Sequence, residues 1–401
     1  FSNAFMVDSD FENATFYTAG NGSDIDFSNA FMVDSDFENA TFYTAGNGSD
    51  IDFSGAYMVY SDFVYASFDT EGDGSDIDFA YATTSAIFYK ADLETAGVDS
   101  AIDFSKAHMA YSSFEDASLY TAGVQSDIDF WGAYMPYGAS SGASFEDASL
   151  ETVGYYADIV FENAFMPGAD FANASVYTEG RNAEIDFENA YVPYADFGDA
   201  TLYTAGVGSD IVFSGASIRL QGAVFDDAAL YTAGVQTDID FSGAFMPGAS
   251  FVDASLYTAG IYDADIDFSG AYMPGASFED ASLYTEGINA EIDFSGVSMP
   301  SVADFDNASL YTAGVQSDID FSGASMPNAS FEDASLDTVG DYADIDFENA
   351  YMLGASFANA SVYTEGRNAE IDFENAYVPY ADFGDATLYT AGVGSDIVFS
   401  G

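Results

Sequence analysis

Cysteine is absent from this 401-residue sequence, which holds a single histidine and only five basic residues. Without cysteine no disulfide framework can form, and the redox compartment stays open on that count. Nucleic acid and anionic membranes are both bound through Lys and Arg, so we expect neither as a partner. No apolar run approaches ~20 residues, so we also expect no membrane insertion.

Acidic residues, in contrast, number 68 and give the chain a formal net charge of −63. The hydrophobic fraction of 49% and the aromatic fraction of 17% are too high for a disordered polyanion. We therefore expect a folded chain with a dense negative surface field, whose plausible partners are divalent cations or basic protein surfaces. The chain begins at Phe1 and ends at Gly401 inside repeat units, and we interpret it as a segment of a longer repetitive polypeptide.

One phenylalanine, preceded in most units by Ile-Asp or Ile-Val, recurs along the whole chain. Most successive intervals are 26 residues, and the others are 25, 27, 28 and 31. Residues 1–26 and 27–52 are identical. Such tandem units predict a repeat architecture in which each unit stacks on its neighbours. The recurring residues are Phe1, Phe27, Phe53, Phe79, Phe104, Phe130, Phe161, Phe187, Phe213, Phe241, Phe268, Phe294, Phe321, Phe347, Phe373 and Phe399.

A finer period of five lies inside each unit, and it fits neither an α-helix nor a long strand. Apolar residues recur at this spacing in Phe241, Met246, Phe251, Leu256 and Ile261, and most have Ala two positions earlier. The pattern predicts very short strands and tight corners, with positions i−2 and i pointing inward. Pentapeptides such as ASFVD, ASLYT and AYMPG resemble the pentapeptide-repeat family, whose units read roughly A-[DNS]-[LF]-x-x. The resemblance covers nearly the entire chain and implies a right-handed parallel β-helix.

The coil departs from the family pattern, in which four pentapeptides make one coil. Five pentapeptides plus one residue make the period here, so we expect an enlarged coil of about 26 residues that stacks identical residues about 4.8 Å apart. Thr232 should then lie directly against Thr258. The expected fold is all-β, a single β-solenoid array over 1–401 of about 15 coils, with a small insertion near 136–144.

Three columns in this stack are invariant. Each unit carries Thr-x-Gly, as at Thr232 and Gly234, and we expect the glycine to form a corner with φ > 0 and the threonine hydroxyl to cap that corner by a local hydrogen bond. An alanine column, as at Ala40 and Ala66, predicts positions where only a methyl group fits.

Aspartates flank the isoleucine of the repeated SDIDF segment, and they predict two acidic ladders on the outer face of the stack. Like charges ~4.8 Å apart repel by about 0.9 kcal/mol in water and more near a protein surface, so something must relieve them. One hypothesis is that divalent cations such as Ca²⁺ bind between the carboxylates of neighbouring rungs. The other is a solvated face with diffuse counterions. The candidate metal ligands are Asp24, Asp26, Asp50, Asp52, Asp76, Asp78, Asp127 and Asp129.

A tyrosine column, as at Tyr231 and Tyr257, predicts either an aromatic ladder that stabilises neighbouring coils or a sugar-binding or lateral-association stripe. Asn-x-Ser/Thr sequons are further candidates for modification, although Asp replaces the Asn in half the units. The candidate glycosylation sites are Asn13, Asn39, Asn173, Asn307, Asn328 and Asn359.

Catalysis has little support in the sequence. His108 is the only histidine, and no Ser/His/Asp or Cys/His arrangement is available, so we expect no enzyme and no required cofactor. The leading hypothesis is an extracellular or cell-surface fibre, sheath or stalk that self-associates end to end by coil stacking. One alternative is an acidic binding module, because the family resemblance implies that some members mimic duplex DNA. Another is a calcium-stiffened adhesin stalk.

Overall fold

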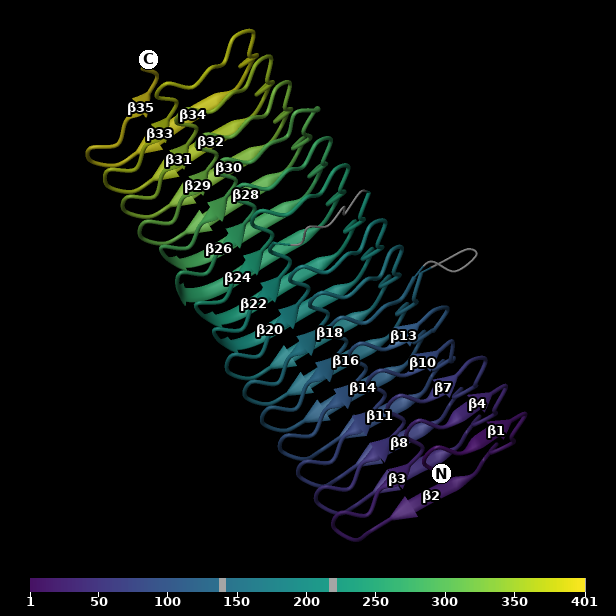
Figure 1. The fold of residues 1–401 in the computed structure, drawn as a ribbon. Helices are drawn as coiled ribbons and strands as arrows, with labels where there is room; N and C mark the ends of the chain where they lie inside the picture. The colour runs from purple at the N-terminus through teal and green to yellow at the C-terminus, as the bar shows by residue number, and fades with distance from the viewer. Residues whose placement is uncertain (137–141, 216–221, 401) are drawn as a thin grey trace. The chain divides into compact units, whose positions relative to one another are not determined.

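The computed structural model describes residues 1–136, 142–215 and 222–400, and every regular element in these ranges is a β-strand (Figure 1). The chain divides into two compact units, Phe1–Ala205 and Gly206–Gly401, and each is described by itself. An uninterrupted array through both units stays a prediction. Most of the insertion expected near 136–144 lies outside the described residues.

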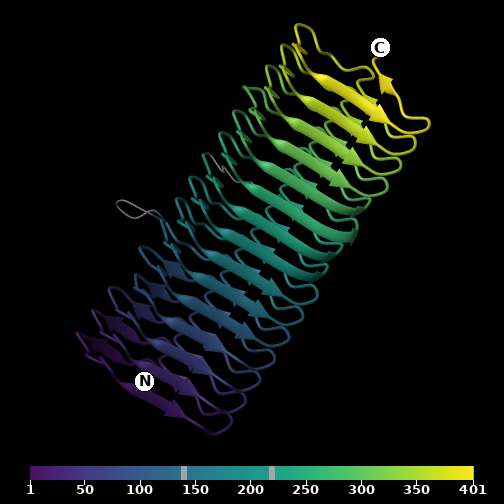
Figure 2. The ribbon, with the colours of Figure 1, turned by 180° about the vertical axis from the view of Figure 1, so that it is seen from behind.

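The first unit contains three parallel sheets, each with at most one strand per coil (Figure 2). The first sheet contains β1 (Phe5–Val7), β4 (Phe31–Val33), β7 (Tyr57–Met58), β10 (Thr83–Thr84) and β13 (His108–Met109). The second sheet contains β2 (Thr15–Thr18), β5 (Thr41–Thr44), β8 (Ser67–Thr70), β11 (Asp92–Thr95), β14 (Ser118–Ala122), β16 (Ser149–Val153), β18 (Ser175–Glu179) and β20 (Thr201–Val207), whose residues up to Ala205 belong to this unit. The third sheet contains β3 (Ile25–Asp26), β6 (Ile51–Asp52), β9 (Ile77–Asp78), β12 (Ile102–Asp103), β15 (Ile128–Asp129), β17 (Ile159–Val160) and β19 (Ile185–Asp186).

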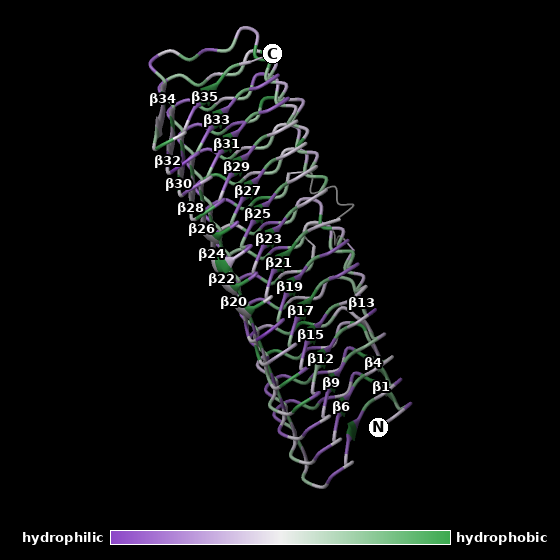
Figure 3. Cartoon of the chain, turned by 90° about the vertical axis from the view of Figure 1, so that its left-hand side faces the viewer, coloured by the Kyte–Doolittle hydropathy of each residue, from purple (hydrophilic) through white to green (hydrophobic). Residues whose placement is uncertain are grey.

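The second unit repeats the second and third sheets. The second-sheet strands are β22 (Ala229–Val235), β24 (Ser255–Tyr262), β26 (Ser282–Ile288), β28 (Ser309–Ala313), β30 (Ser335–Val339), β32 (Ser361–Glu365) and β34 (Thr387–Ala391). The third-sheet strands are β21 (Ile211–Val212), β23 (Ile239–Asp240), β25 (Ile266–Asp267), β27 (Ile292–Asp293), β29 (Ile319–Asp320), β31 (Ile345–Asp346), β33 (Ile371–Asp372) and β35 (Ile397–Val398). Hydropathy recurs at the same place in successive coils of each unit (Figure 3).

The register confirms the parallel β-solenoid with about 26 residues per coil. Thr232 pairs with Thr258, as the sequence predicts, and Ile25 pairs with Ile51. In-register stacking places each side chain against its counterpart one coil away. The handedness inherited from the family resemblance stays a prediction. Among the described residues, no helix is long and apolar enough to cross a membrane.

The core is built from columns of like, mostly apolar side chains. Phe241, Met246, Phe251 and Leu256 are fully buried, and the alanine column is buried beside them. The Phe241 and Phe251 rings meet edge to face at 5.6 Å, and Phe241 stacks on its counterpart one coil away at 4.9 Å. Both geometries are favourable for aromatic pairs.

Ile261, expected to point inward, is 59% exposed, so this prediction is wrong. The chain continues as an extended strand after Leu256, and side chains in a strand alternate every second residue. Leu256 and Thr258 therefore point inward, and the chain rounds a corner before Ile266 enters the core. Each coil is four pentapeptides plus a longer segment, and not five pentapeptides plus one residue.

The glycine of Thr-x-Gly also differs from its prediction. Gly46, Gly97 and Gly287 are among the column members without a positive φ. A Cβ on Gly46 would lie 2.5 Å from the carbonyl carbon and oxygen of Gly20, and one on Gly287 would lie 2.6 Å from the Gly260 oxygen. The invariant glycine is therefore required because neighbouring backbones approach too closely for any side chain.

The threonine of Thr-x-Gly caps its corner as predicted. Its side chain is buried, and in Thr312 the hydroxyl donates to the Ser317 carbonyl at 2.6 Å. Thr258 donates in the same way to Ala264 at 2.8 Å. Thr364 is an exception, because its buried hydroxyl has no hydrogen-bond partner within the described residues.

Candidate functional site

The carboxylates that precede each buried isoleucine form a ladder joined by the backbone. The N–H of Asp50 donates to the Asp24 carboxylate at 3.1 Å, and the N–H of Asp76 donates to Asp50 at 3.0 Å. In the second unit the N–H of Asp265 donates to the Asp238 carboxylate at 2.9 Å. Asp24, Asp50 and Asp238 thus each accept a backbone hydrogen bond from the next coil, which favours their charged form.

The carboxylates that follow the isoleucine close a local turn instead. Asp26 accepts the backbone N–H of Ser28 at 2.9 Å and its hydroxyl at 2.7 Å, and Asp52 accepts the N–H of Ser54 at 2.8 Å. Asp129 accepts the N–H of Trp131 at 2.6 Å. This side chain to backbone bond two residues on is typical of an Asx turn. The second ladder therefore holds the corner between the third sheet and the next side of the coil.

Carboxylates of both ladders are half-buried, and burial is the largest cause of the raised pKa of Asp76, Asp78, Asp127 and Asp238. Burial raises the pKa of Asp76 and of Asp127 to about 6, and that of Asp78 to about 7. In Asp238 burial raises the pKa to about 8, and the charges of Asp265 and Asp210 add to it. Burial therefore favours the protonated form of these carboxylates, and the backbone hydrogen bonds to them favour the charged form. Calcium at the predicted aspartates stays a prediction.

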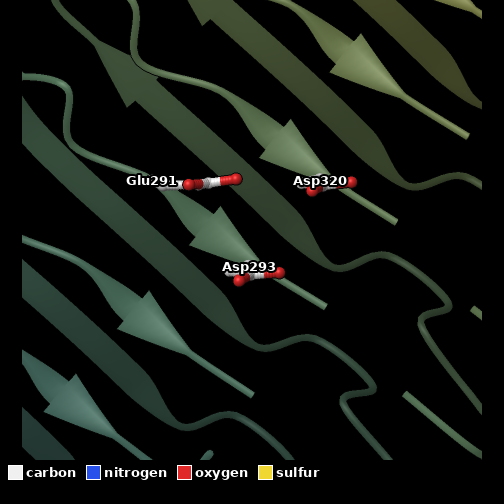
Figure 4. Close-up of side chains that lie close together, drawn as sticks. All are labelled: Glu291, Asp293 and Asp320. Atoms are coloured by element: carbon white, nitrogen blue, oxygen red, sulfur yellow. The ribbon is translucent and has the colours of Figure 1, made fainter. Parts of the chain in front are cut away.

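Within the described residues, three carboxylates that the sequence did not single out form a cluster that could hold a metal ion. Glu291, Asp293 and Asp320 each place a carboxylate oxygen within 4.8 Å of the others, on neighbouring coils of the third sheet (Figure 4). Burial and then the charges of Asp293 and Asp320 raise the pKa of Glu291 to about 8. A cation there would have to displace that proton. A Glu in this column is not by itself a usable signal, because Glu184 and Glu370 occupy the same position outside the cluster.

The tyrosine column forms the predicted aromatic ladder on the outer face of the second sheet. Tyr231 and Tyr257 stack at 4.8 Å, Tyr257 and Tyr284 at 4.7 Å, and Tyr177 and Tyr203 at 4.9 Å. Such cross-strand pairs stabilise neighbouring coils. A sugar-binding or lateral-association role of this column stays a prediction.

All six candidate glycosylation residues are exposed at corners. Each has a left-handed backbone, with φ between 55° and 61°. Asn and Asp adopt this conformation more readily than most residues, which explains why Asp253 occupies the equivalent corner at φ 57°. The asparagines therefore have a structural reason to be there, and their glycosylation stays a prediction.

The residues that occur only once have packing partners. Trp131 lies 4.2 Å from the Lys106 ammonium, a cation–π contact, and Lys106 also donates to the Tyr81 hydroxyl at 3.0 Å. His108 is exposed, and its ring lies 5.0 Å from the Tyr134 ring. Within the described residues His108 has no hydrogen bond to a serine or a carboxylate, so no catalytic triad is formed there.

No protein-family model and no curated protein matches the chain. Among solved structures, HetL, a pentapeptide repeat protein of the cyanobacterium Nostoc involved in heterocyst differentiation regulation, is 18% identical with a TM-score of 0.15 over 63% of this chain and 89% of HetL. Full-length QnrB1, a plasmid-mediated fluoroquinolone resistance protein, is 14% identical with a TM-score of 0.16 over 78% of this chain and 92% of QnrB1.

The structures similar to this chain thus include a pentapeptide repeat protein. At such TM-scores the similarity carries no argument about function, so the proposals below rest on the chain's own geometry.

Proposed function

We propose that this chain is a structural repeat protein, whose coils stack on coils of further copies to build an extracellular or cell-surface fibre, sheath or stalk. The observation that carries the proposal is the stacking of two identical coils. Residues 1–26 and 27–52 have the same sequence, and they pair like on like at Phe5 with Phe31, at Thr15 with Thr41 and at Ile25 with Ile51. A coil that stacks in register on its own copy within a chain can stack in the same way on a copy from another chain.

Each coil offers the same kind of stacking surface to the next coil. This supports growth of a fibre without a dedicated interface. The backbone N–H and C=O groups of one coil pair with those of the next, and unpaired strand edges are templates for further strands. The core phenylalanine columns then continue at the same spacing, as at Phe16 on Phe42 with ring centroids 4.8 Å apart. The exposed sequons support an extracellular location, because N-glycosylation occurs on secreted proteins.

Charge controls this association. The formal net charge of −63 repels neighbouring copies, and salt screens repulsion between exposed charges. We therefore expect self-association to strengthen when salt is added, and also when the half-buried carboxylates take up protons. The binding-module and calcium-stalk alternatives stay predictions, and the raised carboxylate pKa values argue against a fully ionised mimic of DNA phosphates.

Sedimentation velocity over a range of protein and salt concentrations tests the proposal. The unmodified chain should form species larger than the monomer that grow with concentration. Phe16→Lys places a charge in a core column of the first coil and should reduce this growth. Asn13→Lys is the matched control, because Lys90 occupies the equivalent corner at φ 55°. A monomer at every concentration and salt level would contradict the proposal.

A further inference from the structure

The outer face of the first sheet carries a second aromatic ladder, and this ladder has one gap. Phe5 and Phe31 stack at 4.9 Å, and Phe31 and Tyr57 at 5.0 Å. The next coil has Thr83 at this position, paired in register between Tyr57 and His108. Beyond the gap the ladder resumes, with the His108 and Tyr134 rings 5.0 Å apart.

The gap coincides with the one coil that is a residue short. The interval from Phe79 to Phe104 is 25, and the residue is missing at the corner after the first sheet. The neighbouring coils have Val59-Tyr60 and Ala110-Tyr111 there, where this coil has Ser85 alone. Tyr60 and Tyr111 adopt left-handed backbones with φ of 61° and 67°, and the Tyr60 N–H donates to the Ser85 hydroxyl at 2.9 Å.

A cavity of about 200 Å³ results, and it lies wholly within the first unit. We call it the notch. Tyr60 lines one side, His108, Tyr111 and Tyr134 line the other, and Thr83 and Ser85 lie between. The coils that carry Tyr60 and Tyr111 are two coil spacings apart, about 9.6 Å. The missing rung therefore leaves room for one ring between aromatic walls, and the volume is below the ~300–1,000 Å³ of pockets for larger ligands.

The lining determines the chemistry of that ring. No carboxylate, Lys or Arg belongs to the described lining, so the notch offers no partner for a charged group. Aromatic faces pack against the C–H faces of a sugar ring. The Ser85 hydroxyl accepts the Tyr60 N–H and can still donate, and the Thr83 hydroxyl, the tyrosine hydroxyls and the His108 imidazole offer further polar atoms at the edges. An aromatic ligand would leave these polar atoms without hydrogen-bond partners. The negative field of the chain opposes the binding of an anionic sugar.

We infer that the notch is a binding site for one neutral hexopyranose unit of a glycan. The ring lies over Thr83 and Ser85, between Tyr60 and the His108–Tyr111 wall. This inference is independent of coil stacking between chains, because all of its residues lie on the outer surface of one unit. It gives the chain a second property, attachment to a neutral polysaccharide.

Saturation-transfer NMR and calorimetric titration of the full chain with neutral methyl hexopyranosides and their tetramers test the inference. We expect saturable binding of at least one sugar, with little binding of the matching hexuronate. Thr83→Tyr restores the missing rung by the ladder's own pattern and should weaken binding at least tenfold. Ser298→Tyr is the matched control, because Ser298 interrupts the equivalent column of the second unit next to Tyr272. It should leave binding unchanged.

Tyr111→Ala provides a second variant if Thr83→Tyr disturbs the coil, and it should also weaken binding at least tenfold while the thermal unfolding midpoint changes little. The inference is overturned if no sugar gives saturable binding at millimolar concentration, or if Thr83→Tyr binds as tightly as the unmodified chain. Binding of p-cresol without binding of any sugar would also overturn it, because the notch would then be an aromatic site.

Discussion

At the scale of single residues, the ladder carboxylates are under two opposing influences. Backbone hydrogen bonds favour their charged form, and burial favours their protonated form. Burial is the larger influence in Asp238, whose pKa it raises to about 8. In Glu291 burial and the neighbouring charges raise the pKa together, to about 8. A chain that builds half-buried carboxylates into every coil should therefore depend on pH in the opposite direction from most proteins.

The sign of this pH dependence follows from linkage. A carboxyl group with a raised pKa binds its proton more tightly in the folded than in the unfolded chain, so its stabilisation is complete below the unfolded pKa and is lost as pH rises through the folded value. The pKa of Asp238 rises from 3.8 to about 8, which sets the window. Thermal unfolding followed by circular dichroism should give a higher Tm near pH 5 than near pH 8.5.

Asp238→Asn tests the contribution of a single ladder carboxylate to this pH dependence. The amide oxygen can still accept the Asp265 N–H, so the variant should raise Tm by ~2–4 °C near pH 8.5, equivalent to about 1 kcal/mol, and change little near pH 4.5. The exposed corner variant Asp253→Asn is the control and should be nearly neutral at both pH values. A Tm that falls steadily on acidification from pH 8.5 to 5 would contradict this account.

The invariant glycine provides a second test at this scale. At Gly46 an added Cβ would overlap the Gly20 backbone, so Gly46→Ala should destabilise the first unit by on the order of 3 kcal/mol or more. Gly243 has φ 63° and open space around its Cα, and Asn189 fills the equivalent corner of another coil. Gly243→Asn should therefore cost about 0.5 kcal/mol or less. Denaturant unfolding of both variants compares the effect of close backbone approach with the effect of a positive φ. Equal losses of unfolding free energy would show that close backbone approach is not the requirement.

At the scale of the element, the corner after the second sheet depends on one buried hydroxyl per coil. Thr312 donates to Ser317 across this corner, whereas the Thr364 hydroxyl has no described partner. Thr312→Val should cost about 1–3 kcal/mol because it leaves a buried carbonyl without a donor. Thr364→Val, in the same column, should be neutral or stabilising. Chemical denaturation measures the free energy of unfolding of both variants. Equal losses would contradict the capping role of the threonine hydroxyl.

The same corner shows what the sequence could and could not predict. The coil length and the register followed from the spacing of the phenylalanines, because like residues stack only if the coil equals the repeat. The exposure of Ile261 was missed because a period of five continues through a segment where the backbone has become an extended strand. The alternation of Leu256, Tyr257 and Thr258 was the signal of that strand. The sequence alone could not show why position 46 requires glycine, since a corner with positive φ and a close backbone approach both select this residue.

The candidate sites were less predictable for a physical reason. The sequence places carboxylates in columns, but it does not show that a backbone N–H of the next coil lies within reach of Asp24 or Asp238. It shows a residue missing next to Ser85, but not that the shortened corner leaves a cavity lined by Tyr60 and Tyr111. Both features arise from the register between coils, which becomes visible only when neighbouring coils are in place.

At the scale of the whole molecule, stability should be a sum over coils and their interfaces. Deleting residues 27–52 removes one duplicate coil and joins Asp26 to Phe53, the same sequence that Asp52 and Phe53 form now. We expect this deletion to shift Tm by no more than ~2 °C, because each remaining coil keeps its neighbours. Deleting 27–39 shifts half a coil out of register and should unfold the coils around it. Circular dichroism melts and limited proteolysis distinguish the two outcomes.

The most direct test of the central claim, that coils of one chain stack on coils of another, is cryo-electron microscopy of the purified chain at raised salt. The account predicts filaments longer than one chain, with an axial repeat near ~4.8 Å and one coil of about 26 residues per layer. Discrete particles no longer than a single chain at every concentration, or filaments without that repeat, would contradict it.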